Sequence, residues 1–184
     1  MFKRGFLITL LAIVAAGCDS KSPTAPADPN VVVFTAQLNG ANEVPPITNA
    51  EANARGDARI TMNLTRDGAN NITGATFNFV VNLNSFPAGS VWTLAHIHEG
   101  APGIAGPVRV NTGLTSATAI TLTNGSVANQ TFSNIAFNPT VNPDAVNLIN
   151  QMIVNPNGFY YNVHTALNGG GAVRGPLFKL QLID

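Results

Sequence analysis

The sequence predicts an all-β protein, an antiparallel Greek-key β-sandwich with one short helix. Three observations predict it: short runs of β-branched and aromatic residues recur, Asn, Gly and Pro separate them, and one run alternates between apolar and polar residues. The dipeptides Asp67-Gly68 and Asn124-Gly125 tolerate the positive φ angles of tight hairpin turns. Eight or so strands at this spacing are typical of a sandwich or barrel. The expected strands are residues 32–38, 54–64, 72–83, 92–98, 108–111, 117–122, 158–165 and 171–180.

The run from 75 to 83 is the clearest strand in the sequence. Phe77, Phe79 and Val81 fall on one face and Asn78 falls on the other, because successive side chains of a strand point to opposite faces. This alternation indicates one buried face and one solvated face. The large apolar residues that we expect in the core are Phe77, Phe79, Val81, Trp92 and Phe178.

The helix is expected over residues 143–155. Asn142 can cap its first turn, where Pro143 also fits, and a Pro-Asn-Gly sequence at 156–158 stops it. Its apolar residues fall on one side, which indicates a helix that packs against the sheet. These residues are Val146, Ile149 and Ile153.

The first 17 residues have the features of a bacterial lipoprotein signal peptide. Lys3 and Arg4 precede an apolar run at 6–14 that is too short to span a bilayer. Small residues then lead into Cys18, the single cysteine of the chain. We expect residues 1–17 to be cleaved and Cys18 to carry the lipid; the alternative is that Cys18 is an incidental small residue of an ordinary signal peptide.

The rest of the chain divides into a tether and one domain. Residues 18–30 contain three prolines and no large apolar side chain, so we expect a disordered, Pro-rich tether. Residues 31–184 form the domain, which is long enough to bury its own core. The expected location is the cell envelope, on its periplasmic or cell-surface face, with the membrane as partner through the lipid anchor.

The charge of the mature chain bears on its partners. Cleavage removes Lys3 and Arg4, which leaves seven basic residues against nine acidic ones, a net charge of −2 with neutral histidines. Nucleic-acid phosphates require clustered Lys and Arg, so we expect no nucleic-acid partner. The sequence leaves a protein or small-molecule partner open.

Three blocks of sequence resemble a known family. Residues 34–46 include Gly-Ala-Asn-Glu-Val-Pro-Pro, residues 95–100 read Ala-His-Ile-His-Glu-Gly, and a closing block combines Tyr-Asn-Val-His-Thr at 161–165 with Gly-Ala-Val-Arg-Gly at 171–175. In this order they are similar to the opening, central and closing motifs of the CHRD (chordin) domain family. The resemblance implies an extracytoplasmic β-domain of the kind found in secreted bacterial proteins and in chordin; it implies no established activity.

Two positions depart from the family pattern. Ala172 stands where the family usually has Glu, and Asn-Gly-Gly at 168–170 replaces its common Asn-Pro-x-Gly turn. The first departure removes a candidate acidic group near the closing block.

All three histidines of the chain lie in these blocks and form a candidate metal site. His96 and His98 are two residues apart on an expected strand, so both side chains point to one face. His164 comes from a separate strand, as a third ligand would. Three neutral imidazoles suit copper or zinc. The alternative is that His96 and His98 lie in a polar stripe, each hydrogen-bonded to a backbone carbonyl, and that His164 is a structural histidine beside Thr165.

A looser resemblance favours copper over zinc. Copper-zinc superoxide dismutases also carry a His-x-His strand, a later copper-binding histidine and an arginine near the C-terminus, and His96, His98, His164 and Arg174 follow that order. No histidine lies between His98 and His164, so the metal-bridging ligand and the zinc-site histidines have no counterpart. We expect Glu99 and Arg174 to lie near the cluster as outer or rim groups; Arg174 could instead be a strand-end charge paired with an acid.

The function we expect is a lipid-anchored binding module with a three-histidine, copper-type site. Catalysis stays open, with a non-catalytic role favoured, and no residue is assigned as catalytic. One alternative is a superoxide-dismutase-like copper enzyme, that is, a copper-dependent oxidoreductase. The other alternative is a cell-surface interaction module whose histidines are purely structural.

Overall fold

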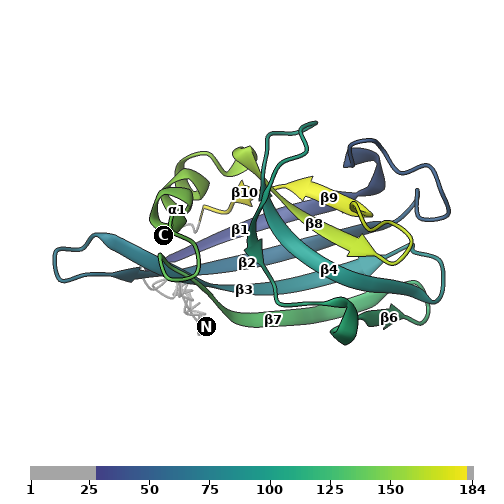
Figure 1. The fold of residues 1–184 in the computed structure, drawn as a ribbon, viewed down its shortest axis with the longest axis horizontal. Coiled ribbons are helices and arrows are strands. Elements are labelled where there is room, and N and C mark those ends of the chain that lie inside the picture. Colours follow the sequence, from purple (N-terminus) through teal and green to yellow (C-terminus); the bar gives the residue numbers. More distant parts are fainter. Residues whose placement is uncertain (1–27, 182–184) are drawn as a thin grey trace, which may run out of the picture.

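A computed structural model describes residues 28–181, in which one strongly curved antiparallel sheet is accompanied by one short α-helix (Figure 1). The predicted all-β antiparallel fold with a short helix is confirmed. The predictions for residues 1–17 and for Cys18 lie outside the described residues. The strands are β1 (Val31–Asn39), β2 (Arg55–Arg66), β3 (Ile72–Asn84), β4 (Ser90–Glu99), β5 (Val108–Asn111), β6 (Ile120–Leu122), β7 (Val127–Phe137), β8 (Phe159–Thr165), β9 (Val173–Pro176) and β10 (Phe178–Lys179).

The strands pair in the order β5-β4-β8-β9-β1-β2-β3-β7, with β6 added to β4 and β10 added to β1. The sheet curls so that its two ends approach each other, which makes it nearly a closed barrel. Trp92 of β4 meets Phe132 of β7 edge to face, with ring centroids 5.5 Å apart, although these strands lie near opposite ends of the pairing order. Phe79 of β3 stacks on Tyr161 of β8 at 5.6 Å. One half of the sheet, which contains β4 and β8, therefore packs face to face against the other half, which contains β3 and β7. This packing gives the single sheet a sandwich-like arrangement.

The core lies between these two halves. Phe77, Phe79, Val81 and Trp92 are all fully buried there, as the sequence predicts. The prediction for Phe178 is wrong, because its side chain is 50% exposed. The preceding residue, Leu177, occupies the core position, and the next side chain along an extended backbone points the other way.

The helix α1 (Ala145–Val154) is shorter than predicted and packs against β3. Asn142 acts before the helix: its side-chain oxygen accepts a hydrogen bond from the Asp144 N–H, and Asp144 takes the N-cap position. The buried positions of α1 are Ala145, Leu148, Ile149 and Met152. Three short 3₁₀ turns also occur in the described residues: η1 (Gly40–Asn42), η2 (Ser116–Thr118) and η3 (Pro156–Gly158).

Strand β7 has no counterpart among the sequence-predicted strands. Most of its side chains are exposed, and Asn129 and Asn134 have positive φ angles that interrupt its register with β3. Asn82 and Asn78 of β3 accept hydrogen bonds from these two irregular backbone positions. A polar edge strand with two irregularities lacks the regular alternation that identifies a strand in sequence.

No helix within residues 28–181 has the length and apolar content that crossing a membrane requires.

Candidate metal centre

Two neighbouring strands carry the three histidines. Ala95 and Ile97 of β4 belong to the hydrophobic core, so His96 and His98 project from the opposite face of the sheet. β8 pairs with β4 and places His164 on the same face as His96 and His98. The three side chains are only 6–8% exposed. The structure therefore brings together, in a buried position, the three residues that the sequence suggested as ligands.

An irregularity in β4 separates this face from the core-facing Trp92. The β4–β8 register shifts between Trp92 and Leu94, so one extra residue, Thr93, is accommodated there. Such a bulge reverses the side-chain alternation at that point. Trp92 can therefore enter the core while Leu94, His96 and His98 follow each other on the other face.

The histidine rings lie close enough to share one ion. Their candidate ligand nitrogens all lie within 4.8 Å of one another. The ring centroids are 5.0 Å apart for His96 and His164, 5.6 Å for His96 and His98, and 5.9 Å for His98 and His164. Metal–imidazole bonds of about 2.0–2.1 Å fit a point between nitrogens at this separation after small movements.

Backbone carbonyls define the tautomers of two rings. His98 Nδ1 lies 2.9 Å from the Gly106 carbonyl oxygen, and His164 Nδ1 lies 3.0 Å from that of Gly169. A carbonyl oxygen can accept a hydrogen bond but cannot donate one. In both neutral rings Nδ1 therefore carries the proton and donates the hydrogen bond, and Nε2 keeps its lone pair. This is the outer hydrogen bond that metal-binding histidines usually make.

The ring nitrogens that contact no backbone carbonyl supply the candidate ligand atoms. His96 Nδ1 lies 3.2 Å from His164 Nε2. Without an ion, the Nδ1–H of His96 can therefore donate a hydrogen bond to the lone pair of His164 Nε2. His98 Nε2 is buried and has no hydrogen-bond partner among the described residues. The converging donor set is therefore Nδ1 of His96 with Nε2 of His98 and of His164.

Two loops supply these carbonyls, and each is held in place by specific contacts. The loop between β4 and β5 passes so close to β4 that a Cβ at Gly106 would lie 1.6 Å from the Glu99 carbonyl oxygen, so only glycine fits. The Tyr160 hydroxyl accepts a hydrogen bond from the Gly106 N–H at 3.1 Å. The turn after β8 is fixed by buried Glu51, which accepts hydrogen bonds from Thr165 and Asn168, both at 2.6 Å.

Electrostatics keep the rings neutral. Burial, followed by the neighbouring His164 and His98, lowers the pKa of His96 to about 4. Burial is also the main reason that the pKa values of His98 and His164 lie below the usual histidine value. Neutral imidazole is the form that ligates a metal, so the cluster is ready to bind at neutral pH.

Glu99 and Arg174 lie in different surroundings. Glu99 projects from β4 on the face opposite to His98 and forms a partly exposed salt bridge with Arg109, at 2.6 Å. Arg174 of β9 is buried, and its guanidinium carbon lies 4.6 Å from the centre of the Tyr160 ring. Tyr160 in turn stacks on His98, with ring centroids 4.9 Å apart. Tyr160 therefore connects Arg174 to the histidine cluster.

Sequence reasoning missed Tyr160 and Asn162. Tyr160, Asn162 and His164 follow the i, i+2, i+4 spacing of one strand face. This spacing could have indicated from the sequence that Tyr160 and Asn162 lie beside His164. The pairing of β8 with its neighbours sets Asn162 opposite both His96 and Arg174, and this long-range register has no local signal in the sequence.

Comparison with known proteins gives one family. The sequence model of the CHRD domain matches residues 34–177, a range that includes the whole histidine cluster and the loops that support it. Searches of curated proteins and of solved structures find no match to the chain.

Proposed function

This chain belongs to the CHRD domain family, and we propose that it is a lipid-anchored, extracytoplasmic binding module whose three histidines hold a transition metal. Copper is the favoured ion.

The observation that carries the proposal is the buried, unpartnered Nε2 of His98. If the rings were purely structural, His96 and His164 would satisfy each other, but His98 would keep a lone pair that nothing in the described residues meets. A buried polar atom without a partner costs about 1–3 kcal/mol. An ion at the centre of the cluster removes this cost and uses the lone pairs of all three rings.

The choice of copper rests on the chemistry of the ligands. Imidazole binds both copper and zinc, but a given set of nitrogen ligands generally prefers Cu²⁺ to Zn²⁺. The cluster contains no carboxylate or thiolate within the described residues.

Metal titration tests the proposal. Untagged protein, stripped with EDTA, is incubated with Cu²⁺ or Zn²⁺, and the metal retained after gel filtration is measured. We expect one copper per chain, an electron paramagnetic resonance spectrum with nitrogen couplings, and an affinity at least about tenfold lower for His98→Ala and for His164→Ala. Tyr161→Phe is the matched control, because it removes a buried, unpartnered hydroxyl from the same strand on the core face, where the ring packs on Phe79 and not on a histidine.

Two results would oppose the metal proposal. A folded wild-type protein that retains neither ion would show that the histidines are a polar network, and the interaction-module function would then replace the proposed one. Equal copper retention by the wild type and both histidine variants would place the ion elsewhere.

A copper-dependent oxidoreductase is the second candidate, because three protein ligands leave a coordination position free, as catalytic metal sites do. A superoxide dismutation assay on the copper-loaded protein separates the two. A rate above that of the His98→Ala variant at equal total copper would favour the enzyme.

The lipid anchor is supported by the sequence around Cys18, where small residues follow the short apolar run. We expect the wild type to fractionate with membranes and Cys18→Ser to be soluble or to keep its signal peptide. The physical reason is that acyl chains contribute about 0.8 kcal/mol per buried CH₂. Mass spectrometry of the N-terminal peptide gives an independent readout, and identical fractionation of both proteins would contradict the anchor.

A further inference from the structure

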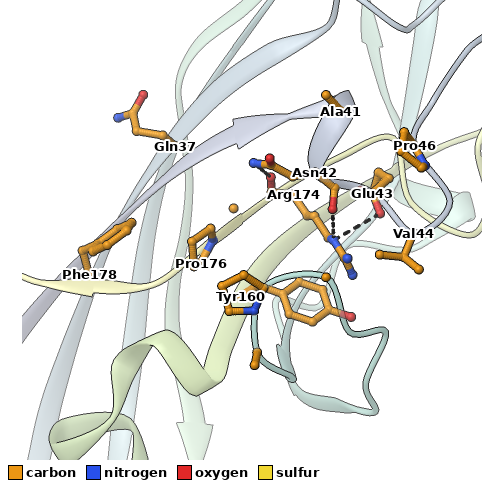
Figure 2. A pocket seen from close by; sticks show the side chains of 14 residues that line it. Gln37, Ala41, Asn42, Glu43, Val44, Pro46, Tyr160, Arg174, Pro176 and Phe178 are labelled. Carbon is orange, nitrogen blue, oxygen red and sulfur yellow. Dashed lines mark hydrogen bonds and ion pairs between the residues drawn. The ribbon is translucent and has the colours of Figure 1, made fainter.

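A cavity of about 600 Å³ lies beside the histidine cluster, on the other side of Tyr160. It is bounded by β1, β9 and β10 and by the segments that follow β1 and β4. Figure 2 shows Arg174 reaching from β9 to a position between Glu43, Val44 and Tyr160. Volumes of about 300–1,000 Å³ are typical of small-molecule sites.

Arg174 is held rigidly but is not fully bonded. Its Nε donates to the Asn42 carbonyl oxygen, and its Nη1 donates to that of Ile104 at 3.2 Å. The Tyr160 ring supports the guanidinium. The third nitrogen, Nη2, is buried and has no partner within residues 28–181, and the whole side chain is only about 5% exposed. The guanidinium therefore has one N–H₂ group that meets no acceptor in the described residues; because this nitrogen is buried, a ligand in the cavity reaches it only when the lining side chains move aside.

Glu43 does not satisfy that group. Its Oε2 lies 3.9 Å from Arg174 Nε, beyond hydrogen-bond distance, and its Oε1 has no partner in the described part of the chain. Burial raises the pKa of Glu43 to about 7 despite the opposing effect of Arg174. Near neutral pH the carboxyl group is therefore often protonated, and a protonated carboxyl can donate a hydrogen bond. In that form the cavity keeps the positive charge of Arg174 uncompensated.

The remaining lining is mainly apolar. Val44 and Phe178 line the cavity, and their side chains are 46% and 50% exposed. Pro46, Pro102 and Pro176 add rigid apolar surface. Such walls suit the hydrocarbon part of a ligand, whose burial contributes about 25 cal/mol per Å².

We propose that this cavity binds a small organic molecule with one carboxylate group, which Arg174 and Glu43 hold while the apolar part lies against Val44 and Phe178. One carboxylate oxygen accepts from Arg174 Nη2, and the other accepts the proton of the Glu43 carboxyl. A doubly charged phosphate fits less well, because a single free N–H₂ group and a neighbouring acid leave most of its charge unpaired. The proposal does not depend on metal binding.

Titration of the metal-free protein with small carboxylates tests the proposed ligand site. Benzoate and hexanoate are added at pH 6 to full-length protein in detergent and EDTA, and their neutral amides serve as probes of the same shape. The side-chain Nε–H signal of Arg174 is followed by NMR and assigned through its loss in Arg174→Lys. We expect the carboxylates to bind at least about tenfold more tightly than the amides.

Three variants locate the site. Arg174→Lys keeps a positive charge but removes the guanidinium N–H₂ group, and we expect it to weaken benzoate binding about tenfold. Ala101→Trp places a large ring on an exposed cavity-lining position and should block entry without touching the core. Arg109→Lys is the matched control, because Arg109 is a partly exposed arginine outside the cavity, and binding should be unchanged.

The outcomes separate this proposal from the metal proposal. If Arg174→Lys fails to fold in a thermal melt, Ala101→Trp decides. Three results would each overturn the carboxylate proposal. They are equal binding of carboxylates and amides, undiminished binding in Ala101→Trp, and no shift of the Arg174 signal at millimolar ligand. Because EDTA is present throughout, a protein that binds no copper could still pass this test.

Discussion

Glu43 and the histidines respond to pH in opposite directions. The folded-state pKa of Glu43 is about 7, well above its ordinary value, so between these two values the folded protein holds a proton that the unfolded chain releases. This contribution to stability is therefore lost as pH rises through about 7. The pKa of His96 is lowered to about 4, so as pH falls below the ordinary histidine value the unfolded chain takes up protons that the folded protein does not. Acid therefore destabilises the histidine cluster.

Glu43→Gln isolates the acidic residue. Glutamine keeps the shape and cannot ionise, so the variant should gain stability relative to the wild type as pH rises from 5 to 8. A pKa shift of this size corresponds to about 3 kcal/mol, and we expect a difference of that order between the two ends of the range. Urea unfolding of both proteins in EDTA measures it. Parallel stability curves for the two proteins would mean that Glu43 titrates normally.

The lowered pKa values of the three histidines would set the pH range of the proposed metal binding. Histidines with the usual pKa of about 6.5 would lose metal to protons just below neutral pH. Because burial lowers the pKa values of His96, His98 and His164, proton competition should begin at a lower pH.

At the scale of single residues, the sequence predicted the histidine cluster but not its surroundings. The His-x-His spacing places two rings on one strand face wherever that strand lies, so local geometry alone predicts two of the three histidines of the cluster. The burial of Glu43 depends on how the segment after β1 folds against β9, and the salt bridge between Glu99 and Arg109 depends on the β4–β5 pairing. Neither feature has a local sequence signal.

Among the elements, strands with a buried face were predictable and the polar edge strand was not. β3 buries one face and leaves Asn78 and Asn82 on the other, so its alternation is visible in the sequence. β7 presents mostly exposed side chains and contains two asparagines with positive φ, which removes the period-2 pattern. Irregular, polar edge strands of this kind also resist pairing with other chains.

The segments between elements matter as much as the strands for the site. The carbonyls that orient His98 and His164 come from Gly106 and Gly169, which lie in loops. The strands bring the rings together, while the loops determine which nitrogen of each ring carries the proton. A change in either loop can therefore alter the orientation and the tautomers of these two rings without disturbing the sheet.

For the molecule as a whole, one curved sheet separates the apolar core from the polar site. The core lies between the two halves, whereas the histidines and the cavity lie on the other face of β4, β8 and β9. Tyr161 and Tyr160 are adjacent on β8, and the first stacks on Phe79 in the core while the second stacks on His98. The packing of the core therefore supports the strand from which the site is built.

Phe79→Ala tests this dependence on the core. Phe79 is fully buried, stacks on Tyr161 across the core and lies 6.1 Å from the neighbouring Phe77 ring. Removing a buried phenyl ring typically costs about 3–5 kcal/mol, because a cavity remains where the ring packed, and we expect a loss of this size in urea unfolding of the metal-free protein. Phe178→Ala is the matched control: the same change at a side chain that is 50% exposed should cost less than about 1 kcal/mol. Addition of copper should raise the stability of both variants, because an ion that binds only the folded state stabilises it by mass action. A loss below about 1 kcal/mol for Phe79→Ala would show that the two halves of the sheet are not packed against each other at this position.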